Sequence, residues 1–374
     1  MVYQSAFLRR SKNGKAWYGV LKYREGEQWR TRTRKLSAPG KREARRELAA
    51  WRAEMERGTT VPEPSTVPLR DYAESVIASK EHALAIMSVT AKDYRTSMNG
   101  WAAIADVPLS ELTPEAIETA LADMIAGGLS PNTAVKRYIA LKMVLDHAMS
   151  RGHLIASPMS GVPRPARVEP VKNPLDAATV ERVRGLLDGM PSRSWTVAAR
   201  LCLLAGLRAE ETSGLQLADI DLENRTGYVR RAISYGSGGA QIAPPKSKQR
   251  RDFPISQALY DVLEPWIRQH VALYGDGPSV WLLGTADRFA DARDMGRRWS
   301  AFCDVCGIEG AAGRKPTLHD LRHTFATACV RGGMDVKTLQ SILGHASASM
   351  TLDVYASADP AAKASSAAII DSVL

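Results

Sequence analysis

The sequence predicts a multidomain protein of the α+β class, mainly α-helical with small antiparallel sheets. Its 374 residues are enough for two or three domains, each with its own hydrophobic core. Helix start signals recur through the middle and C-terminal parts, whereas strand-like alternation is confined to a few short runs. Two proline-rich stretches, 58–68 and 158–174, predict linkers. The expected domains are residues 1–60, 66–160 and 174–374.

The first domain is predicted to be a small sheet packed against one helix. Residues 16–36 read as a β-hairpin with a turn at Glu25-Gly26-Glu27. Residues 39–57 predict a helix whose apolar stripe, Ala44, Leu48, Trp51 and Met55, faces that sheet. Three arginines share one face of the second strand: Arg30, Arg32 and Arg34. Such a face is either solvated or enters a DNA groove, and the register of the three favours DNA.

The positive charge of the chain is concentrated in this first part. Residues 1–65 hold 16 Lys and Arg against 7 Asp and Glu, a net charge of +9, while the whole chain carries +10. A basic block on an otherwise balanced chain is typical of a nucleic-acid contact. A helix on a membrane surface explains it less well, because the block also alternates like strands.

The second domain is predicted to be all-α. Thr113-Pro114-Glu115 and Ser130-Pro131-Asn132 each place an N-cap before a proline at the first helical position. In the last long helix, Val135, Ile139 and Met143 form an expected core face. Three basic residues lie elsewhere on that helix, as phosphate contacts or as a solvated face: Lys136, Arg137 and Lys142.

Membrane and disulfide-rich classes are excluded by the composition. No apolar run reaches the roughly 18 residues of a membrane span, and the N-terminus has no apolar signal-peptide core, so we expect a soluble, cytoplasmic protein. The four cysteines are too few and too uneven for a disulfide framework. Cys303 and Cys306 have half the spacing of a zinc site, but no second pair accompanies them, so we expect a buried structural role and no metal.

From Asp176 onward helices dominate, apart from two strand-like runs. These are 227–234 and 252–255, joined through the glycine-rich Tyr235–Gly239. Lys246 lies between the runs, where a flexible hairpin delivers its ammonium to a substrate, although solvated turn lysines are far commoner. The alanine-rich tail, 356–374, predicts a helix that docks on a neighbour.

The most informative motif is His319-Asp320-Leu321-Arg322-His323. His319, Arg322 and His323 stand at i, i+3 and i+4, so a helix starting near Thr317 projects all three from one face. Leu321, Phe325, Ala328 and Cys329 are expected on the opposite, core face. A solvated helix face is the alternative interpretation of this box taken alone.

Further basic and phenolic residues stand in three other boxes. Arg208 follows Gly206-Leu207 at the end of an apolar run, where a corner holds its guanidinium rigidly, and Glu211 is placed to brace it. Leu343-Gly344-His345 predicts a helix end that points His345 outward. Tyr355 follows ten residues later. A phosphodiester needs donors on its non-bridging oxygens, a proton shuttle and a nucleophile, and Arg, His and Tyr supply these.

Taken together, these boxes resemble those of the tyrosine recombinases, the family of phage and mobile-element integrases. That family is marked by GLRxxE, a hairpin lysine, HxxR, LGH and a tyrosine nine or ten residues after LGH, and all five stand here in order between about Asp176 and Ala356. The resemblance implies an arm-type DNA-binding domain, a helical core-binding domain and a catalytic domain. Asp252-Phe253 departs from the small or β-branched residue usual there, so Lys248 remains an alternative to Lys246.

The resemblance also implies a role for each residue of the boxes. Arg208 and Arg322 clamp the phosphate, and Lys246 is the general acid for the leaving 5′ oxygen. His319 is a general base or phosphate donor, with His323 beside it, and His345 is a phosphate donor. Tyr355 is the nucleophile that forms a 3′-phosphotyrosyl link, which conserves the phosphodiester and implies no metal or nucleotide cofactor.

A site-specific integrase acting on double-stranded attachment sites as a homotetramer is therefore the leading hypothesis. A DNA-bending host factor and an excision factor are further partners that the resemblance implies. Two rivals remain: a type IB topoisomerase-like enzyme that nicks and reseals one duplex, and a DNA-binding regulator without turnover. The separate N-terminal module argues against the first rival, and the retention of every candidate catalytic residue argues against the second.

Overall fold

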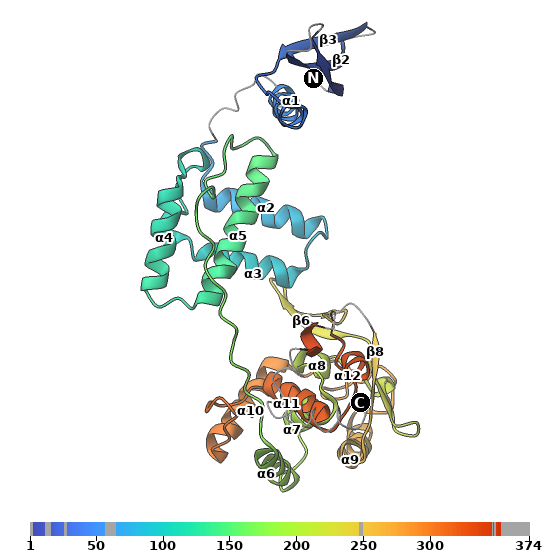
Figure 1. Ribbon diagram of the computed structural model, residues 1–374. Helices are drawn as coiled ribbons and strands as arrows, with labels where there is room; N and C mark the ends of the chain where they lie inside the picture. The colour runs from blue at the N-terminus through green and yellow to red at the C-terminus, as the bar shows by residue number, and fades with distance from the viewer. Residues whose placement is uncertain are drawn as a thin grey trace, which may run out of the picture. The chain divides into compact units, whose positions relative to one another are not determined.

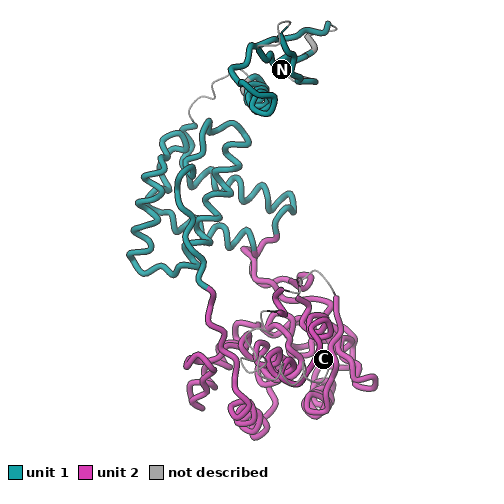
Figure 2. The backbone as a smooth tube through the Cα atoms, in the orientation of Figure 1, with its two compact units in different colours: residues 1–86, 90–168 teal, residues 87–89, 169–374 magenta. Residues whose placement is uncertain are grey.

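The computed structural model describes residues 3–11, 16–25, 28–56, 65–246, 250–345, 347 and 349–352. Two compact units divide the chain: residues 1–86 with 90–168, and residues 87–89 with 169–374 (Figure 2). The boundary at residue 168 falls within the predicted second linker. The division into three domains stays a prediction. Among the described residues, no helix is both long and apolar enough to cross a bilayer.

The N-terminal module is a three-stranded antiparallel sheet with one helix on it (Figure 1). The predicted hairpin is confirmed as β2 (Trp17–Glu25) and β3 (Gln28–Lys35), and the predicted helix as α1 (Lys41–Glu56). A third strand that the hairpin pattern does not predict, β1 (Tyr3–Arg10), pairs with β2. Gly19 allows the helix to come close, because a Cβ there would lie 2.8 Å from Leu48 Cδ1. Leu21, Leu48 and Trp51 are buried between sheet and helix.

The three predicted arginines of β3 do share a face, and it is the face that α1 covers. Arg30, Arg32 and Arg34 stand opposite Tyr23, Leu21 and Gly19. Directly opposed residues of an antiparallel pair point to the same side of the sheet, and Leu21 is fully buried against the helix. The arginines remain exposed because β3 is an edge strand whose residues all lie open to solvent. They therefore border the helix and do not stand on the open face of the sheet.

The helical part of the first unit begins its helices where the sequence predicts. The Thr113 and Ser130 side chains accept hydrogen bonds from the amides of Ala116 and Thr133, at 3.2 and 3.3 Å. Trp101 is fully buried and donates its indole N–H to the Arg137 carbonyl at 3.1 Å. The elements are α2 (Leu69–His82), α3 (Ser88–Asn99), η1 (Ala102–Ile104), η2 (Leu109–Glu111), α4 (Pro114–Ala126) and α5 (Pro131–Ser150).

The predicted core face of α5 is only partly correct. Val135 is buried and Met143 is partly buried, but Ile139 is 41% exposed. The fully buried line of the helix runs through Ala134, Leu141 and related positions instead. A spacing of exactly four residues rotates slowly around a helix of 3.6 residues per turn, so a stripe drawn that way leaves the core.

The second unit consists of helices and two small antiparallel sheets. β4 (Ile220–Asp221), β5 (Thr226–Val229) and β8 (Arg251–Pro254) form one sheet in that order, while β6 (Ala232–Gly236) and β7 (Gly239–Ala243) form a hairpin. The first predicted run, 227–234, is thus two strands. Arg230 and Arg231 interrupt it, because both donate to the buried carboxylate of Asp219, at 2.8 and 2.5 Å.

Helix α7 (Ser194–Ala205) is the centre of this unit and is buried along nearly its whole length. It packs against α11 (Leu318–Arg331), α10 (Ala292–Cys306) and α9 (Gln257–Tyr274) (Figure 1). In α10, Cys303 is buried with its Sγ 4.0 Å from the Pro316 carbonyl, and Cys306 packs partly buried on the same core. The remaining elements are α6 (Ala177–Asp188), α8 (Ala209–Ser213), η3 (Leu217–Asp219), α9 (Gln257–Tyr274), α10 (Ala292–Cys306), α11 (Leu318–Arg331) and α12 (Val336–Leu343).

Candidate catalytic site

Arg208 is held at a sharp corner between α7 and α8. Gly206 ends α7 in the left-handed region, at φ 66°, and a Cβ there would lie 2.5 Å from Phe325 Cδ1. Arg208 then caps α8 and donates to Glu211 twice, from its backbone N–H at 2.9 Å and from Nη1 at 2.8 Å. The predicted bracing contact is therefore present. The Arg208 side chain remains 15% exposed.

Glu211 is the carboxylate to which the described arginines of the cluster turn. It is 1% exposed, and Arg251 binds it with two hydrogen bonds, 2.9 and 2.6 Å long. Burial alone would raise the pKa of Glu211, but the hydrogen bonds and charge of Arg251, and then the charge of Arg208, outweigh it and lower the pKa to about 2. Glu211 therefore stays ionised and balances part of the arginine charge.

Arg251 is a buried site residue that sequence reasoning did not single out. Besides binding Glu211, its Nε donates to the Ile342 carbonyl at 2.7 Å. Arg251 lies in the basic tract 246–251. Residues of such a tract are usually solvated, so Arg251 did not stand out from its neighbours. The only available signal was its place at the start of a strand-like run, where alternate residues point inward.

Arg322 links the two boxes that flank it in space. Its Nη1 donates to the Gly206 carbonyl at 2.6 Å and its Nη2 to the Leu343 carbonyl at 2.7 Å. Nη1 also lies 3.9 Å from Glu211 Oε2. Burial, followed by the charge of Arg208, lowers the pKa of Arg322 to about 9. With 3% exposure, Arg322 belongs to the interior and not to a solvated helix face.

The two histidines of α11 stand edge to face. The rings of His319 and His323 are 4.7 Å apart between centroids, with an interplanar angle of 84°. Desolvation by the surrounding protein atoms lowers the pKa of both histidines. It does so for His319 even though part of that residue is exposed to solvent. The pKa of His323 falls to about 4. The lowered pKa values favour the neutral rings, which act as single hydrogen-bond donors or as proton acceptors.

The opposite face of α11 agrees with the prediction at Leu321, which is fully buried. Phe325 and Cys329 are partly buried and pack on the core formed with α12. Ala328 is exposed, contrary to the prediction, and Ala326 is buried in its place. Ala326 lies on a different row of the helix surface from Leu321, so the buried side of α11 is wider than the predicted stripe.

Lys246 is exposed on the connection between β7 and β8. Its charge is among those that lower the pKa of His319, so the ammonium lies within electrostatic reach of that ring. Lys248 lies outside the described residues, and the choice between the two lysines stays open.

His345 projects from the end of α12. Gly344 stops the helix at φ 63°, and the Gln340 side chain donates to the His345 carbonyl at 3.2 Å. The ring Nδ1 lies 2.9 Å from the hydroxyl of Thr351. Burial and then the charges of Arg322 and Arg208 lower the pKa of His345 to about 4. Tyr355 lies outside the described residues.

The structure therefore joins four charged groups directly, Arg208, Glu211, Arg251 and Arg322, with His319 and His345 beside them. Arg30, Arg32 and Arg34 belong to the other compact unit. In α5, Lys136 is exposed, whereas Arg137 reaches Met124 Sδ at 2.8 Å and Lys142 pairs with Asp146 at 2.9 Å.

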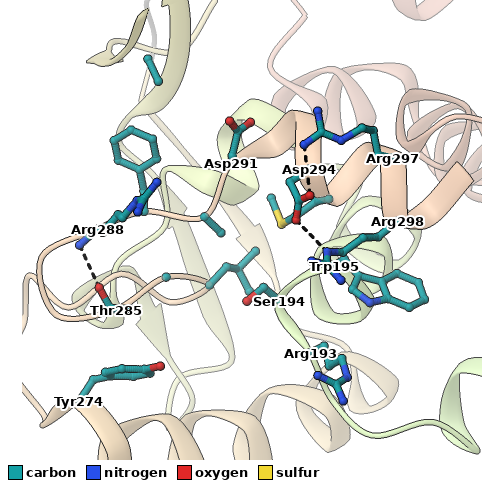
Figure 3. A pocket seen from close by; sticks show the side chains of 16 residues that line it. Arg193, Ser194, Trp195, Tyr274, Thr285, Arg288, Asp291, Asp294, Arg297 and Arg298 are labelled. Carbon is teal, nitrogen blue, oxygen red and sulfur yellow. Dashed lines mark hydrogen bonds and ion pairs between the residues drawn. The ribbon is translucent and has the colours of Figure 1, made fainter. Parts of the chain in front are cut away.

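A hollow of about 740 Å³ elsewhere in the second unit is lined by none of the described candidate residues. Figure 3 shows its aromatic and charged walls, including Trp195, Tyr274 and Asp294. Arg297 and Arg298 line it already paired with Asp294, at 3.2 and 2.7 Å. The arginine cluster around Glu211, and not this hollow, is therefore the candidate catalytic site.

Comparison with known proteins identifies relatives of this chain. A family model described as "Phage integrase family" matches residues 178–362. Tyrosine recombinase XerC of Salmonella typhi is 30% identical over 251 residues, which are 63% of this chain and 76% of that protein. XerC of Proteus mirabilis is 25% identical over 67% of this chain and 76% of that protein.

Solved structures give the same fold. The Tn1549 transposon integrase in complex with transposon right end DNA has a TM-score of 0.64 at 24% identity, covering 80% of this chain and 99% of that one. A lambda integrase dimer bound to a COC′ core site has a TM-score of 0.60 at 18% identity, covering 93% and 94%.

The arginine cluster, the flanking histidines and these similarities define a site-specific DNA recombinase, an enzyme that breaks and rejoins DNA strands. The chain belongs to the phage integrase family, the tyrosine recombinases.

Proposed function

We propose that this recombinase integrates and excises a phage or other mobile element through a 3′-phosphotyrosyl intermediate on Tyr355. The observation that carries the proposal is the cluster in which Glu211 holds Arg208 while Arg322 lies 3.9 Å from the same carboxylate. Two guanidinium groups fixed beside one another match the two non-bridging oxygens of a phosphodiester. Arg208 and Arg322 are the phosphate clamp.

The net positive charge of the cluster suits an anionic substrate. Three arginines, Arg208, Arg251 and Arg322, share one carboxylate, which leaves an excess of two positive charges in a largely buried cluster. A phosphodiester in contact with Arg208 and Arg322 lowers that excess. Donors that are fixed before the reaction stabilise the extra charge of the pentacoordinate transition state without reorganising.

In the cleavage step the Tyr355 Oη attacks phosphorus and forms an O–P bond, while the bond from phosphorus to the 5′ oxygen breaks. His319 accepts the phenol proton, or donates to the phosphate, and Lys246 gives a proton to the leaving 5′ oxygen. His345 donates to a non-bridging oxygen. Rejoining reverses these transfers with the 5′ hydroxyl of another strand, and since the ester is conserved the cycle consumes no nucleotide.

The remaining parts of the chain are assigned to DNA and to assembly. We assign residues 1–60 to arm-type sites through Arg30, Arg32 and Arg34, and residues 66–160 to the core site. Lys136, Arg137 and Lys142 contact phosphates there, which requires Lys142 to exchange Asp146 for DNA. The catalytic domain is 174–374, and the enzyme acts in the cytoplasm.

We further propose a homotetramer on DNA, helped by a DNA-bending host factor and an excision factor. One solved relative is a lambda integrase tetramer bound to a Holliday junction, with a TM-score of 0.58 at 19% identity. Four copies bring four cleavage sites to two duplexes, which is what exchanging two pairs of strands requires.

A strand-exchange assay tests the proposal. Two duplexes of different length carry the ends of the element that encodes the protein, and the purified chain is added with a host extract. Hybrid duplexes whose junctions match the excised element are expected from the wild type and not from Arg322→Ala. A parallel assay uses supercoiled DNA. Relaxation of that DNA without hybrid duplexes would favour the topoisomerase-like activity. DNA binding without relaxation and without hybrid duplexes would favour the regulator.

A further inference from the structure

Thr351 is a buried hydroxyl residue whose side chain meets His345. It is fully buried, and its Oγ1 lies 2.9 Å from the His345 Nδ1. A hydroxyl hidden from water needs a partner, because leaving it unsatisfied costs free energy. Neither the family motifs nor the sequence patterns give this threonine a role.

The backbone of His345 is already fixed before the ring is considered. Gly344 turns the chain at φ 63°, and His345 N–H donates to the Gln340 carbonyl at 3.2 Å. The Gln340 side chain returns a hydrogen bond to the His345 carbonyl. What remains variable is the rotation of the ring and the nitrogen that carries its proton, and the contact with Thr351 restricts both.

The direction of the hydrogen bond decides what the ring offers to the site. A neutral imidazole has one N–H and one lone pair, and the partner of one nitrogen sets the state of the other. If the Thr351 hydroxyl donates to Nδ1, the proton stands on Nε2. The Nε2 atom then presents an N–H that donates to a phosphate oxygen. A lone pair on Nε2 would instead repel that oxygen.

We infer that Thr351 is a positioning residue that donates its hydroxyl hydrogen to His345 Nδ1 and so holds Nε2–H as a phosphate donor. The inference rests on the proposed role of His345 in strand cleavage. Burial and nearby arginine charge keep the pKa of His345 low, which agrees with a neutral ring whose tautomer matters. Without the Thr351 hydroxyl the ring stays in place, but neither its tautomer nor its rotation is fixed.

The test compares Thr351→Val, which keeps the shape without the hydroxyl, with Thr351→Ser, which keeps the hydroxyl. The probe is a nicked duplex carrying the joined ends of the element, and the readouts are the rate of covalent adduct formation and DNA affinity. Thr351→Val is expected to slow the adduct about 10- to 100-fold at unchanged affinity, less than the loss of a whole oxyanion donor, and Thr351→Ser to restore most of the rate. The matched control is Thr226→Val in β5, which removes the 3.1 Å hydrogen bond from Thr226 Oγ1 to the Asn224 carbonyl. This control is expected to keep the wild-type rate.

Nitrogen-15 NMR of histidine-labelled protein gives a readout that a structural defect would not imitate. The His345 signal, identified by its loss in His345→Gln, is expected to show Nε2 protonated in wild type and a mixture in Thr351→Val. A protonated Nδ1 in wild type overturns the inference, as does a Thr351→Val that cleaves at the wild-type rate or a Thr351→Ser as slow as valine. A wild type without any adduct instead refutes the proposed function.

Discussion

At the scale of single residues, one carboxylate organises the site. Glu211 accepts hydrogen bonds from Arg208 and Arg251 and lies near Arg322, so its charge is felt by all three guanidinium groups. Removing one partner of a buried ion pair leaves charges without compensation, and that is more costly than the net value of the pair. The effect of a change at Glu211 therefore appears in stability as well as in cleavage.

We expect Glu211→Gln to lower the free energy of unfolding by about 3 kcal/mol at neutral pH. Because the folded-state pKa of Glu211 is lowered, the stabilisation is complete above the ordinary glutamate pKa of about 4.5 and is lost as the pH falls toward about 2. Urea unfolding of wild type and variant across that range measures the difference. Glu210→Gln, an exposed neighbour, is the control, and a Glu211→Gln deficit that does not shrink with acid contradicts the account.

Lys246 and Lys248 are distinguished by the leaving group. We expect Lys246→Ala to slow cleavage of ordinary DNA about 10²- to 10⁴-fold, the usual range for a lost general acid. A substrate with sulfur in place of the bridging 5′ oxygen leaves as a thiolate and needs no proton, so it restores the rate in Lys246→Ala. The same loss and rescue in Lys248→Ala, with Lys246→Ala unaffected, would assign the role to Lys248.

At the scale of elements, the corner between α7 and α8 places the first arginine. Its requirement for glycine is both conformational and steric, since a side chain at Gly206 meets Phe325 and Leu343 from two other helices. Gly307 ends α10 at φ 59° with nothing within 4 Å of an added Cβ. Comparing substitutions at Gly206 and Gly307 therefore separates the cost of backbone strain from the cost of a steric collision.

We expect Gly307→Ala to cost about 1 to 2 kcal/mol, the strain of a left-handed residue, and to leave the cleavage rate near that of wild type. Gly206→Ala is expected to cost more and to slow cleavage, because the displaced corner moves Arg208 away from Arg322. Chemical denaturation and the covalent adduct rate measure both. Equal losses from the two variants would mean that the collision has no effect on the site.

The elements also show what sequence reasoning reaches. Capping residues and periodicity predicted α4, α5 and α11, because caps and side-chain spacing are local properties. Arg251 was missed because its partners, Glu211 and the Ile342 carbonyl, are distant in sequence. Ile139 was misplaced because a helix face is defined by what packs on it, which the helix alone does not specify.

At the scale of the whole molecule, charge is divided between a basic N-terminal block and a nearly neutral remainder. We expect Arg30→Ala, Arg32→Ala and Arg34→Ala together to reduce the slope of log affinity against log salt by about 2 to 3, since each phosphate contact contributes about 0.9. Binding to long DNA of the element ends at several salt concentrations measures it. An unchanged slope in the triple variant, together with weaker DNA binding by Lys22→Ala and Trp29→Ala, would place DNA on the opposite face of the sheet.

The central claim is that Tyr355 becomes covalently joined to DNA while Arg208 and Arg322 hold the phosphate. The most direct measurement is mass spectrometry of the detergent-resistant adduct formed on a nicked duplex with the element's joined ends. The account predicts a nucleotide attached to the peptide that contains Tyr355, and no adduct from Tyr355→Phe although that variant binds the duplex. An adduct on another residue, or one that persists in Tyr355→Phe, would contradict it.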